Sequence, residues 1–421
     1  MNKTTVGIVI IAVLLIASNA TWAYYSMVVN QPTSTVKPIK IGVLLPFTGS
    51  TAFIGENARA AARLAMDEIN EMGGILGRPV EIVVADDAGD AQTATTQYQK
   101  LVSVDKIDAL IGVHRSAVAL ALMDLISQYR TPTIFVGPGS VTITQRITDN
   151  YDKYKTVFRL NTNSTVNFLP RAGLILDVLM PKFNVTKYGL MTEDVTAGVE
   201  EHAILKSYLA NNSGPQLVYE AKVSPTAIDY SAEIVNQRNS GAQVICVYMT
   251  TTSAVTYLKQ AHEAQVPFVI MDAITMFFSN DGITATKESG NYFTGLSFGI
   301  NKAMTEKTVP FFDKYYARTG WWPQSYAFHE YDAFYVFKNA VERAGSLEES
   351  MLIPALETTN WTGSSGKIVF TSSHDLLYGE KYTWMPMVQW FWENNAARAE
   401  IVWPANKASA QYQVPPWVTW P

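Results

Sequence analysis

The residues with the chemistry to bind a small molecule lie where predicted strands end. Three loops in the first part of the chain, 46–55, 112–116 and 137–142, are rich in hydroxyl groups and backbone amides, and two of them run into predicted helices. Amides at a helix N-terminus, together with the helix dipole, favour an anion such as a carboxylate. We therefore expect Ser116 and Ser140 to lie near a carboxylate-binding site.

A second set of strand-end loops, 193–198 and 249–252, contributes carboxylates and hydroxyls, and Asp272 lies directly at the end of another predicted strand. In open α/β sheets, ligands bind beyond the carboxyl ends of the strands. An anion site that faces an acid across a cleft suits a zwitterion.

Each of these residues also has a purely structural interpretation. Ser116 and Ser140 are common helix N-cap or turn residues, and Asp272 can cap the following helix. Arg115 is either a solvated charge on its loop or the partner of a carboxylate. His114 has no nucleophile or carboxylate partner marked in the sequence, so we do not expect it to be catalytic. The aromatic run 326–337 has helical spacing, which predicts core packing.

Composition and motifs argue against several classes of protein. The net charge is −5, whereas nucleic-acid binding is driven by basic patches. The only cysteine is Cys246, and the five histidines show no metal-ligand spacing, so no metal or cofactor is expected. The sequence has no nucleophile elbow, phosphate loop, dinucleotide fingerprint or zinc-protease motif, which indicates a protein that is not an enzyme.

The N-terminus carries an export signal. Lys3 precedes an apolar run, 6–17, of signal-peptide length, and small residues at 18–20 and 21–23 offer cleavage sites. Segment 1–37 is therefore predicted to be a signal peptide, or an uncleaved anchor, followed by a tether. An extracytoplasmic location, in the periplasm or at the cell surface, follows.

The rest of the chain alternates strands and helices, which predicts an α/β fold with parallel sheets. A chain of 421 residues suits two lobes rather than one core. The stretch 39–70 reads as strand, loop and helix, with the loop at 46–55. Two further helices, 311–318 and 325–344, precede late strands at 366–370, 387–392 and 401–403. The Trp- and Pro-rich tail is expected to pack against a lobe.

Three stretches carry a resemblance to a known family: IKIGVLLPFTGSTAFIGENARAAARLAMDEINEMGGILGRPVEIVVADDAGD, QKLVSVDKIDALIGVHRSAVALAL and TPTIFVGPGS. The sequence resembles the extracytoplasmic solute-binding proteins of branched-chain amino-acid type ABC importers, over roughly residues 38–370. The resemblance implies a type I periplasmic binding protein fold: two doubly wound α/β lobes with a hinge of three crossings, closing on the ligand like a flytrap. Lobe 1 would comprise 38–158 and 295–366, and lobe 2 would comprise 159–294 and 367–421.

The resemblance also implies roles for individual residues. Ser116 and the loop Ser140, Val141 and Thr142 would hold the carboxylate of an amino acid, and Asp272 its ammonium group. Phe53 and Ile54 would contact the ligand's side chain. Ala197 and Thr250 stand where family members often have an aromatic residue, so they leave room for a larger ligand.

The expected function is capture of a small amino acid or related carboxylate and delivery to a membrane permease. A ligand-sensing ectodomain, or a binding protein for amides, urea-like compounds or aromatic carboxylates, is the alternative. A secreted enzyme on the same lobes is the remaining rival.

Overall fold

The computed structural model describes residues 36–274 and 280–420. The chain divides into a unit of Met1–Pro38 and a unit of Ile39–Pro421, and the second contains all the helices and strands of the described residues. The predicted signal or anchor and nearly all of its tether lie outside the described residues. Within those residues, no helix combines the length and apolar character needed to cross a membrane.

The first sheet is parallel throughout, in the order β2-β1-β3-β4-β5. Its strands are β1 (Ile39–Leu45), β2 (Val80–Asp86), β3 (Ala109–Gly112), β4 (Thr133–Phe135) and β5 (Val157–Arg159). Successive side chains of a strand point to opposite faces, and both faces of β1 are buried: Val43 belongs to one hydrophobic cluster and Leu44 to another. The sheet is therefore covered by helices on both sides, as a doubly wound lobe requires.

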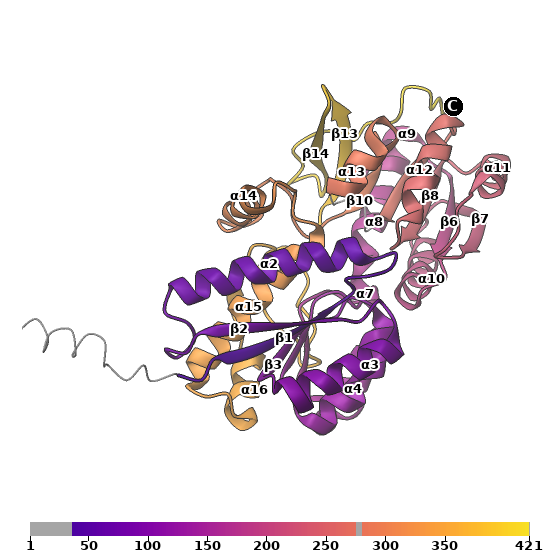
Figure 1. The fold of residues 1–421 in the computed structure, drawn as a ribbon. Coiled ribbons are helices and arrows are strands. Elements are labelled where there is room, and N and C mark those ends of the chain that lie inside the picture. Colours follow the sequence, from indigo (N-terminus) through magenta and orange to yellow (C-terminus); the bar gives the residue numbers. More distant parts are fainter. Residues whose placement is uncertain (1–35, 275–279, 421) are drawn as a thin grey trace, which may run out of the picture. The chain divides into compact units, whose positions relative to one another are not determined.

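The helices over the two faces come from different parts of the chain. One face carries α2 (Ala52–Glu71), α14 (Thr308–Thr319), α15 (Ser325–Ala344) and α16 (Glu349–Glu357). The other carries α3 (Ala91–Lys100), α4 (Ser116–Tyr129) and α5 (Val141–Asp149). Helices α2 and α15 lie side by side although more than 250 residues separate their starts (Figure 1).

The second sheet has the order β14-β13-β10-β9-β8-β6-β7. Its parallel strands are β6 (Lys187–Glu193), β7 (Gln216–Val223), β8 (Val244–Met249), β9 (Val269–Ile274) and β10 (Thr294–Leu296). Two antiparallel strands, β13 (Met387–Glu393) and β14 (Ala396–Trp403), extend it. One face packs on α8 (Leu169–Leu174) and α10 (Thr196–Asn211), and the other on α11 (Ser231–Ser240) and α12 (Ser253–Glu263). We call each sheet with its helices a lobe.

Short elements complete the described chain. They are η1 (Leu101–Asp105), α6 (Tyr151–Tyr154), α7 (Ser164–Asn167), η2 (Ile175–Leu179), α9 (Met180–Phe183), α13 (Asn280–Thr286), η4 (Lys287–Gly290), β11 (Trp361–Thr362) and β12 (Lys367–Ile368). The chain passes between the lobes three times, after β5, after β10 and before β13, which agrees with the predicted hinge of three crossings.

The predicted lobe boundaries need correction at each crossing. Arg159 still pairs in the first sheet, so that crossing comes after residue 158. Gly295 and Leu296 pair with β13, so the start of the second lobe-1 segment at 295 is too early. The predicted return of the chain to lobe 2 at residue 367 is too early, because Ile368 and Leu376 are still buried in the lobe-1 core.

The predicted loop 46–55 is also too long, because α2 begins at Ala52. Gly55 in its first turn explains how the helix can start there. A Cβ atom at this position would lie only 2.0 Å from the carbonyl oxygen of Pro46, so only glycine lets the helix approach the end of the loop so closely. Phe53 and Ile54 are consequently helical residues and not loop residues.

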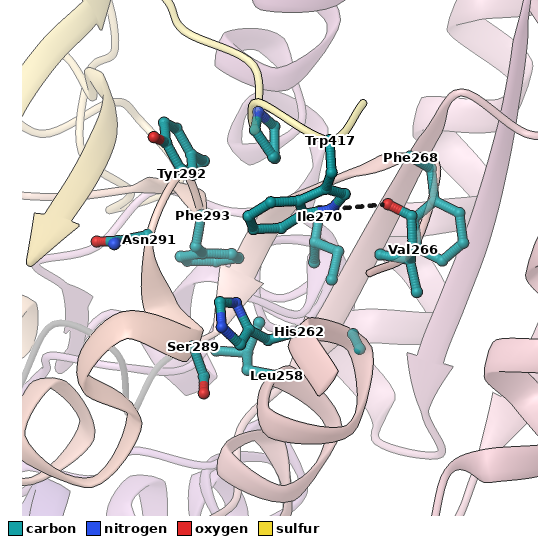
Figure 2. A pocket seen from close by; sticks show the side chains of 12 residues that line it. Leu258, His262, Val266, Phe268, Ile270, Ser289, Asn291, Tyr292, Phe293 and Trp417 are labelled. Carbon is teal, nitrogen blue, oxygen red and sulfur yellow. Dashed lines mark hydrogen bonds between the residues drawn. The ribbon is translucent and has the colours of Figure 1, made fainter. Parts of the chain in front are cut away.

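The C-terminal tail packs against the second lobe, as predicted. The indole Nε1 of Trp417 donates to the carbonyl oxygen of Val266 at 3.2 Å, and that of Trp420 donates to Pro267 at 3.2 Å. Figure 2 shows the Trp417 ring lying across a small cavity of about 30 Å³, with His262 and Tyr292 beside it. The tail therefore closes over the start of β9 instead of extending into solvent.

Candidate functional site

A cavity of about 180 Å³ lies between the strand-end loops of the two lobes. The first lobe lines it with His114, Arg115, Ser116, Ala117, Gly137 and Gly139. Residues 194–197, Tyr248 and Thr250 line it from the second lobe, and Tyr326 from α15 completes it. The cavity is thus formed at the carboxyl ends of β3, β4, β6 and β8, where the strand order predicts a ligand site.

Ser116 is the first residue of α4 and joins two loops of the first lobe. Its buried Oγ accepts hydrogen bonds from the backbone amides of Gly139 at 3.2 Å and Ser140 at 3.1 Å. The N-cap residue is Arg115, whose side chain makes no cap hydrogen bond. The structural role of Ser116 is therefore to fix the 137–140 loop against α4, and its hydroxyl hydrogen stays available to the cavity.

Arg115 brings a positive charge to the cavity wall. Among the described residues it forms no ion pair, and its buried Nε has no hydrogen-bond partner. The buried acid Asp87 lies close enough for the charge of Arg115 to act on its carboxyl group. Burial raises the pKa of the Asp87 carboxyl to about 6. The hydrogen bond that this carboxyl accepts from the Gly89 amide and the charge of Arg115 act to lower the pKa. The guanidinium group and the N-terminus of α4 together make this end of the cavity suited to an anion.

Aromatic side chains form another part of the wall. The rings of His114 and Tyr326 meet edge to face with their centroids 4.7 Å apart. Burial lowers the pKa of His114 to about 3, with the Arg115 charge acting in the same direction, so the imidazole is neutral at pH 7. Burial also raises the pKa of the Tyr248 and Tyr326 phenols, which therefore stay protonated. These uncharged rings suit an apolar or aromatic ligand body.

Asp272 is a correction to the sequence-based site. The residue neither lines the cavity nor caps a helix. It is fully buried in β9. Its carboxylate is ion-paired with Arg171 and accepts a hydrogen bond from His202 Nε2 at 2.8 Å. Its backbone φ is +114°, a strained value for a residue with a side chain. A carboxylate that is ion-paired and buried outside the cavity lining is not placed to hold the ammonium group of a ligand in the cavity.

The neighbours of Asp272 form a buried polar cluster. Arg171 is only 1% exposed and also pairs with Glu201. Burial lowers the pKa of His202 to about 3, with the Arg171 charge acting in the same direction, so its contact with Asp272 is a hydrogen bond of a neutral ring. The hydroxyl group of Thr192 forms a hydrogen bond with the other ring nitrogen of His202, Nδ1. The cluster therefore neutralises Asp272 within the protein.

The N-terminus of α5, residues 140–142, is likewise occupied by a carboxylate of the protein. Ser140 Oγ donates to Glu200 Oε1 at 2.7 Å, and the backbone amide of Val141 donates to Glu200 Oε2 at 2.9 Å. The amide of Thr142 donates to Ser140 Oγ at 3.2 Å. None of the three residues lines the cavity. In the structure, a carboxylate of the protein, that of Glu200, occupies the place that the sequence-based interpretation gives to the ligand's carboxylate.

The remaining predicted residues divide into two groups. Ala197 and Thr250 line the cavity. Thr250 already uses its amide and hydroxyl to donate to Glu193 Oε2, at 2.7 and 2.9 Å. Phe53 and Ile54 do not line the cavity but pack on Val255 and Tyr326, so they support the aromatic wall from behind. Ligand contact by Arg115, Ser116, Ala197 and Thr250 stays a prediction.

A comparison with protein families identifies the chain. The model of the periplasmic binding protein family matches residues 38–390. The chain belongs to this family. It is of the branched-chain amino-acid type, with the type I fold, as the resemblance predicted. Members are solute-binding proteins of transporters.

The relatives of this periplasmic binding protein are distant but extend over most of it. The Leu/Ile/Val-binding protein homolog 3 of Brucella melitensis is 24% identical over 372 residues, which cover 85% of this chain and 91% of that protein. The homolog 8 of Brucella abortus is 24% identical over 302 residues, covering 70% of this chain and 73% of that protein.

Solved structures share the fold at still lower identity. The substrate-binding protein LivJ of Streptococcus pneumoniae, in complex with isoleucine, is 20% identical with a TM-score of 0.75, covering 87% of this chain and all of that chain. A solute-binding protein of R. palustris in complex with benzoate is 17% identical with the same TM-score, covering 90% and 99%.

Sequence reasoning missed Tyr326 and Tyr248, which line the cavity, and Glu200, which contacts Ser140 and Val141 beside it. Tyr326 begins the aromatic run that predicts core packing, which holds for Phe328 and Phe334 but not for Tyr326. Its place in the first turn of a helix is a signal that could have found it. Tyr248 is the last residue but one of the buried strand β8, and Gly198 allows α10 to approach its ring, because a Cβ there would lie 2.5 Å from Tyr248 Cδ1. For Glu200, nothing in the neighbouring sequence indicates that it contacts the other lobe.

Proposed function

We propose that this periplasmic binding protein captures a small monocarboxylate with an apolar, preferably aromatic, body outside the cytoplasm and delivers it to the permease of an ABC importer. The single observation that carries the ligand class is Arg115. It is a guanidinium group without an ion-pair partner among the described residues, placed at the N-terminus of α4 in a cavity with three aromatic walls.

The ligand's carboxylate is assigned to the α4 end of the cavity. Arg115 offers its N–H donors, Ser116 its hydroxyl hydrogen, and α4 its first backbone amides. Hydrogen bonds that involve a charged group contribute about 1.5–3 kcal/mol each. Two of them, with burial of the ligand's apolar surface, are enough for about micromolar affinity.

The size of the cavity supports a ligand with one ring. An engineered apolar cavity of about 150 Å³ in another protein holds benzene. At about 180 Å³, the cavity here suits a ring with a carboxylate attached. The walls formed by His114, Tyr248 and Tyr326 offer ring edges and faces to such a ligand. The related R. palustris protein, which is in complex with benzoate, supports this choice.

A branched-chain amino acid is the second candidate, and Asp194 is the observation that favours it. This acid lines the cavity from the second lobe and is the one place where a ligand's ammonium group finds a carboxylate among the described lining residues. Asp194 is exposed and already paired with Lys222 at 3.3 Å, which makes it a weak ammonium site. The Streptococcus relative, in complex with isoleucine, supports this candidate.

Capture follows from the position of the cavity between the lobes. A ligand that contacts Arg115 in lobe 1 and Tyr248 in lobe 2 has its full set of contacts only when the lobes are closed, so it shifts the population toward the closed form. No catalytic step is part of this proposal, because the cavity offers no activated nucleophile and both of its tyrosines are protonated.

Calorimetric titration with benzoate, benzamide and L-isoleucine tests the proposal. We expect benzoate to bind, benzamide to bind at least tenfold more weakly, and the Arg115→Gln variant to lose ten- to a hundredfold in benzoate affinity, since one charge-assisted contact is removed. Arg63→Gln is the matched control, because Arg63 is an exposed lobe-1 arginine outside the cavity. Equal binding of benzoate and benzamide, or an Arg115→Gln variant with wild-type affinity, contradicts the assignment.

A further inference from the structure

Glu200 connects the two lobes beside the cavity. It lies in the second turn of α10, a helix of lobe 2, and its carboxylate reaches α5 of lobe 1. One oxygen accepts from Ser140 Oγ at 2.7 Å and the other from the amide of Val141 at 2.9 Å. Ser140 is the N-cap and Val141 the first residue of α5, so the carboxylate also lies at the positive end of a helix dipole.

The Glu200 contact is linked to the residues assigned to the ligand. The amide of Ser140 donates to Ser116 Oγ, so one residue connects Glu200 with the hydroxyl at the cavity. On the other side, Ala197 lies one helical turn before Glu200 and lines the cavity. Any separation of α10 from α5 therefore removes the Glu200 contact and opens the cavity wall at the same time.

We propose that Glu200 is a positioning residue for ligand capture. Its carboxylate fills the anion site at the N-terminus of α5 when the lobes close, which stabilises the closed form and leaves the N-terminus of α4, with Arg115, as the site for the ligand's carboxylate. This inference deepens the proposed function and rests on it for the ligand's place, whereas the stabilisation of the closed form is independent of which ligand binds.

The opposite role, in which Glu200 competes with the ligand, fits the geometry less well. A competitor would occupy the cavity, but Ser140 and Val141, which Glu200 contacts, do not line it. The cavity of about 180 Å³ is present in the structure in which the Glu200 contact is formed. Contacts that exist only in the closed form raise its population, and the apparent dissociation constant falls in proportion. Loss of Glu200 should therefore weaken binding, whereas loss of a competitor would strengthen it.

Two variants separate the charge from the side chain. Glu200→Gln keeps the shape and one acceptor oxygen, and Glu200→Ala removes both contacts. Glu263→Gln is the matched control, because Glu263 is an exposed glutamate on α12 of the same lobe. With benzoate as the probe in calorimetry, we expect the dissociation constant to rise about tenfold or more in Glu200→Ala, less in Glu200→Gln, and not in the control.

A distance measurement without ligand keeps this test separate from the proposed function. Nitroxide labels on Gln99→Cys in lobe 1 and Asn236→Cys in lobe 2 are both on exposed helix positions. The native Cys246 is buried, and burial raises the pKa of its thiol to about 12, so it should not react. Pulsed electron paramagnetic resonance should show a closed population in the wild-type background that shrinks in Glu200→Ala.

The outcomes are distinct. A smaller closed population together with weaker benzoate binding supports the positioning role. An unchanged closed population, or tighter benzoate binding in Glu200→Ala, overturns it. If benzoate does not bind the wild-type protein at all, the proposed ligand class fails, and the distance distribution alone decides the role of Glu200.

Discussion

Replacing Asp272 by asparagine separates the two interpretations of this residue. If Asp272 holds a ligand's ammonium group, the variant folds normally and loses affinity for an amino acid. The structure predicts the reverse, because the carboxylate neutralises Arg171 and accepts a hydrogen bond from His202 in a site with no exposure to solvent. We expect Asp272→Asn to lower the free energy of unfolding and to leave ligand affinity within about threefold of the wild-type value.

The magnitude follows from what remains after the substitution. Removing one partner of a buried ion pair costs about 3–5 kcal/mol, because the other charge is left buried. Glu201 still pairs with Arg171, and asparagine keeps the volume and tolerates the positive φ, so the lower end, ~3 kcal/mol, applies. With an m-value of about 3 kcal/mol/M in urea, the unfolding midpoint falls by about 1 M.

Urea unfolding followed by circular dichroism, together with titration of benzoate and L-isoleucine, provides the measurement. Asp313→Asn is the matched control, since this acid is exposed on α14, does not line the cavity and should affect neither the midpoint nor ligand affinity. An Asp272→Asn variant with an unchanged midpoint and isoleucine affinity reduced a hundredfold would contradict a structural role for Asp272. It would restore Asp272 as the ammonium ligand and the amino acid as the ligand class.

Two further predictions concern acid stability and the C-terminal tail. Burial lowers the pKa of His329 from 6.5 to about 3, so between these pH values the unfolded chain binds the proton and the folded one does not; stability therefore rises with pH over this range. His329→Phe should reduce the slope of unfolding free energy between pH 4 and 6 by about 1.4 kcal/mol per pH unit, and an unchanged slope would mean that this ring titrates normally in the folded protein. Trp417→Ala should cost about 2 kcal/mol and accelerate proteolysis of the tail while leaving benzoate affinity unchanged, because its cavity shares no residue with the ligand cavity. A change in benzoate affinity would show instead that the tail influences lobe closure.

The parts of the fold that the sequence predicts are those with a strong periodic signal. The β-branched stretch that forms β8 is buried from end to end and the one that forms β1 is buried except at Lys40, and turn residues separate both from their helices. The lobe boundaries were less predictable, because they depend on which core accepts a short strand. Ile368 lies in a two-residue strand whose local sequence has no preference for either lobe, and only its burial against lobe 1 decides.

Gly55 shows why the first loop was misjudged. Glycine in such a loop usually indicates a turn, and its helix propensity is poor. Here the missing Cβ instead permits contact between α2 and the carbonyl of Pro46. The same residue thus favours a loop by propensity and a helix by packing, and packing prevails because α2 is buried along Ala58 and Ala62.

The candidate site was predictable in position but not in its charges. Strand ends and helix N-termini are visible in a sequence, and Arg115 and Ser116 do lie at the cavity. The availability of a charged group is not visible, because it depends on partners far along the chain. Asp272 is neutralised by Arg171, about 100 residues earlier, and the α5 N-terminus by Glu200, 59 or 60 residues later.

These two pairings change the ligand that the same residues select. A site with Asp272 and the 140–142 amides free would offer an acid and two anion sites, which suits an amino acid, but none of these groups lines the cavity. With both engaged, the described lining retains Arg115 as its unpaired charge, opposed by Asp194, which is already paired with Lys222. A ligand ammonium buried there without a carboxylate partner would lose its hydration without compensation. A carboxylate with an uncharged body avoids that cost, and this difference favours a benzoate-like ligand over isoleucine on the same fold.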